Sequence, residues 1–101
     1  MNYFVCKLIA PRPTIAQDMT PAEAETFKVH GEWWMKLVEK GTCVMVGPVM
    51  DPSGPWGMGI LEMDSIEAVR KLLADDPAIL SPHGFRYDVY PMMRAMLRKG
   101  L

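Results

Sequence analysis

The sequence predicts a single α+β domain, the ferredoxin-like β-α-β-β-α-β sandwich, with both helices on one face of a four-stranded antiparallel sheet. Half of the 101 residues are apolar and 23% are charged, a composition typical of one packed globular domain. Four segments have the composition of β-strands, and two carry helical periodicity behind a capping residue. Right-handed crossovers between elements in this order give the sandwich.

The first strand is predicted over residues 2–10, which are rich in β-branched and aromatic residues. Pro11 and Pro13 end it, and a loop continues to Met19. Both faces of this strand are mostly apolar, so both faces of the sheet need a cover. Because the helices cover only one face, we expect a second copy of the chain to pack on the other, giving a homodimer.

The first helix is predicted to begin at Thr20 and run to Lys40. Thr20 is a good N-cap, Pro21 suits the first helical position, and Glu23 completes a capping box. Gly41 supplies the C-terminal stop. The residues that recur at helical spacing on its expected buried face are Phe27, His30, Trp34, Leu37 and Val38.

The second and third strands are predicted over residues 42–49 and 56–63. Residues 51–55 have a composition rich in Asp, Pro, Ser and Gly, which suits a turn between antiparallel strands. Gly57 and Gly59 alternate on one face of the third strand, where they either leave a shallow groove or permit close approach of the backbone.

The second helix is predicted to begin at Asp64 or Ser65 and to run to Ala74. Asp76 and Pro77 have the identities of an N-cap and first residue for a further helical turn. Residues 85–90 are then the fourth strand.

The domain is predicted to occupy residues 1–91, followed by a basic, Met-rich tail over residues 92–101. The tail has three cations and no acid, which falls short of the basic clusters that bind membranes or nucleic acids. We expect it to form a short helix docked through its apolar residues, which are Met92, Met93, Met96 and Leu97.

Charge and hydropathy argue against two classes of partner. The net charge of −1 does not suit a protein that binds nucleic acid through phosphate contacts. No run reaches the roughly 18 apolar residues of a membrane span, and the first ten residues lack a basic leader and a cleavage site. We therefore expect no membrane partner and a cytoplasmic location.

The sequence indicates no metal or cofactor site. Cys6 and Cys43 lack metal-ligand spacing, and their strands are not neighbours in the predicted sheet, so we expect no disulfide. No Gly-rich phosphate loop connects a strand to a helix, so a nucleotide cofactor is not indicated.

His30 and Asp76 are the candidate catalytic residues. His30 interrupts an apolar helix face, where it is either a general acid or base or a core histidine bonded to a carbonyl. Asp75 and Asp76 oppose the dipole at the end of the second helix, and a local rule broken in this way often marks function. Capping by Asp76 is compatible with that role, because its second oxygen remains available to a histidine.

Four further residues are candidates for substrate binding. Arg12 either holds an anion bidentately or is solvated. Trp34 and Trp56 belong to a ligand site, to the core or to a dimer interface. Ser53, like Asp18 and Tyr87, is of a type that suits a pocket lining, although its spacing does not require that.

Several short motifs, taken in order over residues 3 to 91, resemble the YCII-related domain family. They are the segment 3–13, His30 with Trp34, Leu37 and Gly41, the segment 47–52, the glycines of the third strand, and Asp75-Asp76-Pro77. The resemblance implies a dimeric α/β barrel and an active-site pair that matches His30 and Asp76. Because the family includes a chlorinated-hydroquinone dehydrochlorinase, it also implies an acid–base lyase reaction. The basic tail departs from the family pattern.

Two functional hypotheses remain. The first is a small cofactor-free acid–base enzyme, a lyase or an isomerase, in which Asp76 orients His30. The second is a non-catalytic dimer that binds a small molecule or a protein and keeps the pair as a structural hydrogen bond. An open pocket beside His30 favours the enzyme, and a sealed core favours the binding module. RNA recognition on the sheet is not supported, because the aromatic and basic motif is missing.

Overall fold

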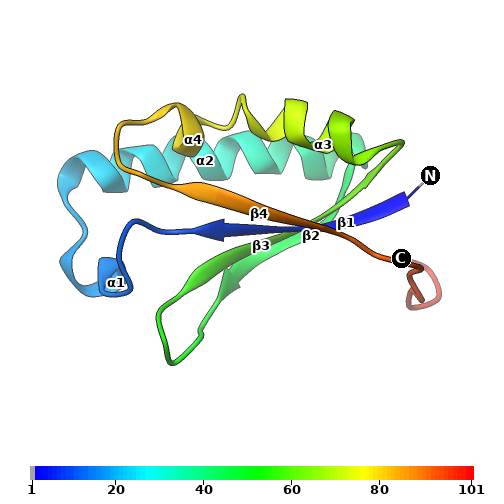
Figure 1. The fold of residues 1–101 in the computed structure, drawn as a ribbon, viewed down its shortest axis with the longest axis horizontal. Helices are drawn as coiled ribbons and strands as arrows, with labels where there is room; N and C mark the ends of the chain where they lie inside the picture. Colours follow the sequence, from blue (N-terminus) through cyan, green and yellow to red (C-terminus); the bar gives the residue numbers. More distant parts are fainter. Residues whose placement is uncertain (1) are drawn as a thin grey trace.

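A sheet and a layer of helices on one of its faces make up the fold (Figure 1). The computed structural model describes residues 2–101. Along the chain the elements are β1 (Asn2–Ile9), α1 (Ile15–Asp18), α2 (Pro21–Lys40), β2 (Cys43–Val49), β3 (Trp56–Met63), α3 (Ile66–Leu73), α4 (Pro77–Leu80) and β4 (Arg86–Pro91). The predicted α+β class and element order are therefore confirmed, and α1 is added within the segment predicted as a loop.

The sheet has the strand order β2-β3-β1-β4, and all neighbouring strands are antiparallel. This is the order that a ferredoxin-like sandwich requires. Because β3 separates β1 from β2, Cys6 and Cys43 are not on adjacent strands, and both are free thiols in the core. The expectation that they do not pair is confirmed.

The ends of α2 and α4 follow the local chemistry of the sequence. Thr20 and Glu23 form the reciprocal capping box at the start of α2, and Gly41 ends the helix with a φ of 83°. Asp76 caps α4 through the backbone N–H of Ala78. These short-range interactions are readable from residue type and spacing, and they match the predictions.

The buried face of α2 is narrower than the sequence predicts. Trp34 and Leu37 are buried, but Val38 is exposed. Val38 lies at the flank of the apolar stripe in the last turn of the helix, so the prediction that it faces the core was wrong.

The main core cluster lies between the sheet and the helices α2 and α3. Its buried members are Phe4, Cys6, Trp34, Leu37, Cys43, Leu61, Val69 and Leu73. Trp34 lies directly on β3 at Gly59, where an added Cβ would come within 2.4 Å of the indole Cη2. The absence of a side chain at Gly59 therefore lets the indole of Trp34 pack against the sheet backbone.

Arg12 connects the segment after β1 to the start of α2 through hydrogen bonds. Its two terminal nitrogens donate to the two carboxylate oxygens of Glu23, at 2.8 and 2.7 Å, and its Nε donates to Asp18 at 2.7 Å. The hydrogen bonds from Arg12, supported by the backbone N–H of Thr20, lower the pKa of Glu23 to about 2. Glu23 is buried and ionised, so this pairing satisfies it.

The outer face of the sheet carries a continuous apolar row. Cross-strand partners share a face, and Met45, Ile60, Val5 and Tyr90 are successive partners across β2, β3, β1 and β4. Met45 and Tyr90 are each 52% exposed. Within residues 2–101, the helices α2, α3 and α4 all lie on the opposite side (Figure 1).

The C-terminal tail does not form the predicted docked helix. Residues 92–101 contain no helical turn, and the Met93 side chain is fully exposed. Ten residues are too few for a helix to be stable without a surface to pack on, and α2 and α3 already cover the inner face of the sheet. Across residues 2–101, no helix combines the length and apolarity needed to cross a membrane.

We expect Gly59→Ala to reduce the free energy of unfolding by about 1–3 kcal/mol, because the new methyl group overlaps Trp34. Urea unfolding measures this change, and near-ultraviolet circular dichroism reports the displaced indole. Gly47→Ala is the matched control, since nothing lies within 4 Å of a Cβ at that strand position. Equal stability of the two variants would contradict the close Trp34 contact.

We expect the stability advantage of the wild type over Glu23→Gln to depend on pH. The pKa of Glu23 falls from 4.5 to about 2 on folding, so the stabilisation is fully present above about pH 4.5. It is lost as the pH falls towards 2, where the folded protein also binds the proton. Urea unfolding between pH 2 and 7 measures this trend, with the exposed Glu25→Gln as control. A difference that is constant over the range argues against the Arg12 pairing.

Candidate active site

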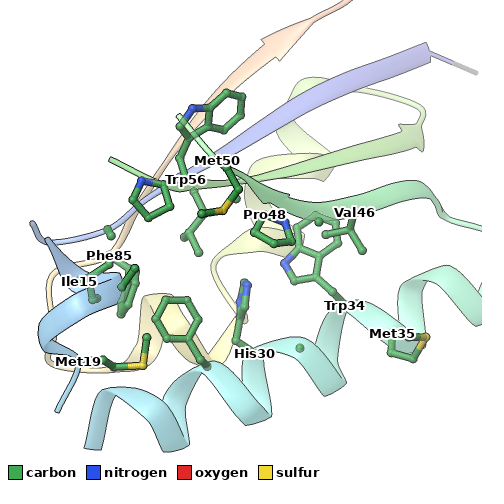
Figure 2. A pocket seen from close by; sticks show the side chains of 18 residues that line it. Ile15, Met19, His30, Trp34, Met35, Val46, Pro48, Met50, Trp56 and Phe85 are labelled. Carbon is green, nitrogen blue, oxygen red and sulfur yellow. The ribbon is translucent and has the colours of Figure 1, made fainter. Parts of the chain in front are cut away.

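A pocket of about 460 Å³ lies between α2 and the sheet (Figure 2). Its lining comes from segments that are distant in the sequence, namely Leu8, Ala10, Ile15, Ala16, Met19, Phe27, His30, Gly31, Trp34, Met35, Val46, Gly47, Pro48, Met50, Pro55, Trp56, Gly57 and Phe85. The exposed methionines Met19, Met35 and Met50 mark the mouth. Almost every lining side chain is apolar, so a molecule in the pocket contacts mainly apolar groups.

His30 is the one ionisable side chain among the lining residues, all of which lie within residues 2–101. The helical spacing of α2 places it one turn after Phe27 and one turn before Trp34, and both neighbours also line the pocket. Its ring points from α2 into the space between the helix and the sheet (Figure 2). The side chain is 15% exposed, which places the imidazole at the wall of the pocket rather than in a filled core.

Asp76 holds the inner nitrogen of His30. The Nδ1 atom of His30 lies 2.8 Å from Oδ1 and 2.9 Å from Oδ2 of Asp76, whose side chain has no solvent exposure. The Oδ1 atom also accepts the backbone N–H of Ala78 at 2.9 Å, which is the cap of α4. Capping and histidine binding are therefore carried out by the same carboxylate at once.

Tyr87 of β4 is a third partner of this carboxylate. Its hydroxyl donates to Oδ2 of Asp76 and accepts the indole N–H of Trp34 at 2.9 Å. Because an indole nitrogen only donates, the tyrosine proton must point towards Asp76. Burial, reinforced by the charge of Asp76, raises the pKa of Tyr87 far above its usual range, so Tyr87 remains a donor.

These partners determine which nitrogen of His30 carries the proton. An ionised carboxylate only accepts hydrogen bonds, so Nδ1 must donate and neutral His30 has its lone pair on Nε2. Within residues 2–101, Nε2 has no hydrogen-bond partner. The lone pair is therefore available to a molecule in the pocket, which is the arrangement of a general base.

The two predicted tryptophans are both lining residues, but their N–H groups are directed elsewhere. Trp34 donates to Tyr87, as described above. Trp56 donates to Asp51 at 3.1 Å, and the ammonium of Lys7 lies 4.7 Å from its ring centroid. The Trp56 indole lies on the far side of the strands from His30 (Figure 2).

Arg12 and Ser53 are not among the lining residues. The guanidinium of Arg12 is bound by Glu23 and by Asp18, another residue considered for a pocket. Ser53 is exposed in the turn between β2 and β3, where its N–H donates to Asp51 at 2.8 Å. Their roles in substrate binding stay predictions, and the geometry gives them other partners.

Two further features bear on the chemistry of the site. Burial, with a smaller contribution from Cys43, raises the pKa of Cys6 to about 12, so this thiol is not a nucleophile at neutral pH. Among residues 2–101, no group of three His, Cys, Asp or Glu side chains is placed to hold a metal ion.

The sequence did not indicate the rim of methionines, because isolated Met residues carry no positional signal.

Comparison with known proteins identifies the family of the chain. The model of the YCII-related domain family matches residues 3–93. A search of curated proteins finds no match to the chain. The family match includes all four helices and both members of the His30–Asp76 pair. The chain therefore belongs to the YCII-related domain family.

Proposed function

We propose that the protein is a small acid–base enzyme, a lyase or an isomerase, in which His30 removes a proton from a small organic molecule. One observation supports this above all others. The outer nitrogen of His30 faces an apolar pocket, while its inner nitrogen is held by a buried carboxylate at 2.8 Å. That combination orients an imidazole for proton transfer. It also requires the desolvation of a buried carboxylate, which is unfavourable and which a purely structural histidine does not need.

The proposed reaction begins with transfer of a substrate proton to Nε2 of His30. In an elimination, the electrons of the broken C–H bond form the double bond as a leaving group departs on the adjacent atom. In an isomerisation, the imidazolium returns the proton to another atom of the substrate. Asp76 stabilises the imidazolium in both cases and does not itself take the proton.

The pocket contributes positioning and a low dielectric constant. Apolar walls strengthen the interaction between the imidazolium and Asp76, because charges interact more strongly away from water. A substrate confined between α2 and the sheet is also held near Nε2, which reduces the entropic cost of the reaction. A binding module without turnover is the second candidate, and the same apolar pocket supports it.

We also propose that the protein is a homodimer formed through the outer face of the sheet. The apolar row of Met45, Ile60, Val5 and Tyr90 would otherwise face water on every strand. A twofold interface covers this row in both copies with one arrangement, and stacked sheets pack about 10 Å apart. The helix side, which holds the pocket, is left outside this interface.

The base role can be tested with 5-nitrobenzisoxazole, a neutral bicyclic molecule that opens to a coloured nitrophenolate when its C3 proton is removed. We expect the wild type to accelerate this reaction and His30→Ala to lower the protein-catalysed rate by about 10²-fold or more, because the base is lost. Absorbance of the phenolate measures the rate. Equal rates for the wild type and His30→Ala would retire the enzyme proposal and leave the binding module.

Two variants control this experiment. His83→Ala removes the other histidine, which is not a lining residue, and its rate should equal that of the wild type. Tyr87→Phe removes one hydrogen bond to Asp76 but leaves His30 in place, so its rate should lie between those of the wild type and His30→Ala.

The dimer can be tested by placing charges in the exposed part of the apolar row. We expect the wild type to have twice the mass of one 11.4 kDa chain by light scattering, and the double variant Met45→Lys, Tyr90→Lys to be a monomer. Leu80→Lys is the control, because Leu80 is also apolar and exposed but lies in α4 on the helix side. A monomeric wild type, or a dimeric double variant, would overturn the proposed interface.

A further inference from the structure

We infer that the pocket selects uncharged, mainly apolar molecules that carry a single hydrogen-bond donor or acidic C–H group, and that this group binds Nε2 of His30. The inference rests on the proposed function, which makes Nε2 the proton acceptor, and it adds the chemical class of the substrate. It follows from counting the polar side chains that the lining leaves available to a ligand.

The lining offers a ligand a large apolar surface. Apart from His30, its side chains are aliphatic, aromatic, thioether or proline, or are absent at glycine. A volume of about 460 Å³ falls within the range of pockets that enclose most of a small organic molecule. Binding there is driven by burial of apolar surface, so a molecule with several polar groups would lose hydration without compensation.

The other polar side chains of the lining are already bonded. The indole N–H of Trp34 donates to Tyr87, and that of Trp56 donates to Asp51. Pro48 and Pro55 have no N–H. Among the side chains that line the pocket, this leaves Nε2 of His30 as the polar atom with capacity for a ligand. Because Nε2 is a single acceptor, the ligand that fits it best carries a single hydrogen-bond donor.

The charges around the pocket disfavour ions of either sign. No Lys, Arg, Asp or Glu is among the lining residues. Arg12, the candidate for binding an anion, is bonded to Asp18 and Glu23. An anion in the pocket would be desolvated with the carboxylate of Asp76 behind the His30 ring. A cation would gain no contact with that carboxylate, which is fully buried and bonded to other groups.

The mouth of the pocket is less selective than its inner wall. Met19, Met35 and Met50 are exposed there, and an unbranched thioether adapts to different shapes at small cost. His30, in contrast, is held at one nitrogen by two carboxylate oxygens and cannot rotate freely. We therefore infer a strict requirement at Nε2 and tolerance of different apolar groups at the mouth.

A matched trio of probes tests the inference by isothermal titration calorimetry at pH 8. Indole is apolar, uncharged and has one N–H donor, 1-methylindole lacks the donor, and indole-3-carboxylate adds a negative charge. We expect indole to bind, 1-methylindole to bind about tenfold or more weakly because Nε2 loses its partner, and the carboxylate to bind most weakly. In His30→Leu, indole and 1-methylindole should bind equally, while the control His83→Ala should keep the difference.

Each other outcome overturns part of the inference. Equal binding of indole and 1-methylindole to the wild type overturns the donor requirement, and tighter binding of the carboxylate overturns the exclusion of charge. No binding by any probe overturns the assignment of the pocket as an apolar ligand site. The proposed function is judged separately by the rate of 5-nitrobenzisoxazole opening, so the inference can fail while the base role of His30 stands.

Discussion

Asp76 is the group on which both the fold and the site depend, because a carboxylate without solvent exposure must be fully hydrogen-bonded to remain ionised. Its partners come from three elements: the N–H of Ala78 in α4, the hydroxyl of Tyr87 in β4 and Nδ1 of His30 in α2. The same bonds that pay the cost of burying this charge also join the helix layer to the edge strand and orient the imidazole. Structure and chemistry are thus coupled through one side chain.

Much of the fold could be predicted from the sequence because its signals are local. The capping box of Thr20 and Glu23, the stop at Gly41 and the Asp76-Pro77 start of α4 each depend on residues a few positions apart. The strand order then follows from the sequence of elements and the handedness of crossovers. The His30–Asp76 pair could be proposed for the same reason, since each residue broke a local rule at its own position.

The rest could not be predicted, because it depends on contacts between distant segments. The pocket is the space that remains between α2, the segment after β1 and the turn before β3. Because these segments are distant in the sequence, no single stretch of residues indicates the pocket. The sequence alone allows Arg12 to bind a substrate, whereas in the structure its guanidinium donates hydrogen bonds to Glu23 and Asp18. The tail has the basic and apolar composition of a short docked helix, but ten residues do not form a stable helix unless they pack against other elements, and residues 92–101 form none.

Trp34 has four roles at once: it belongs to the core cluster, packs on Gly59, lines the pocket and donates a hydrogen bond to Tyr87. A smaller residue there would enlarge the pocket but would also open a core cavity and release the tyrosine that holds Asp76. Met19, Met35 and Met50 belong to neither core cluster and can change without that penalty. Substitutions that reshape the pocket should therefore be tolerated more easily at Met19, Met35 and Met50 than at Trp34.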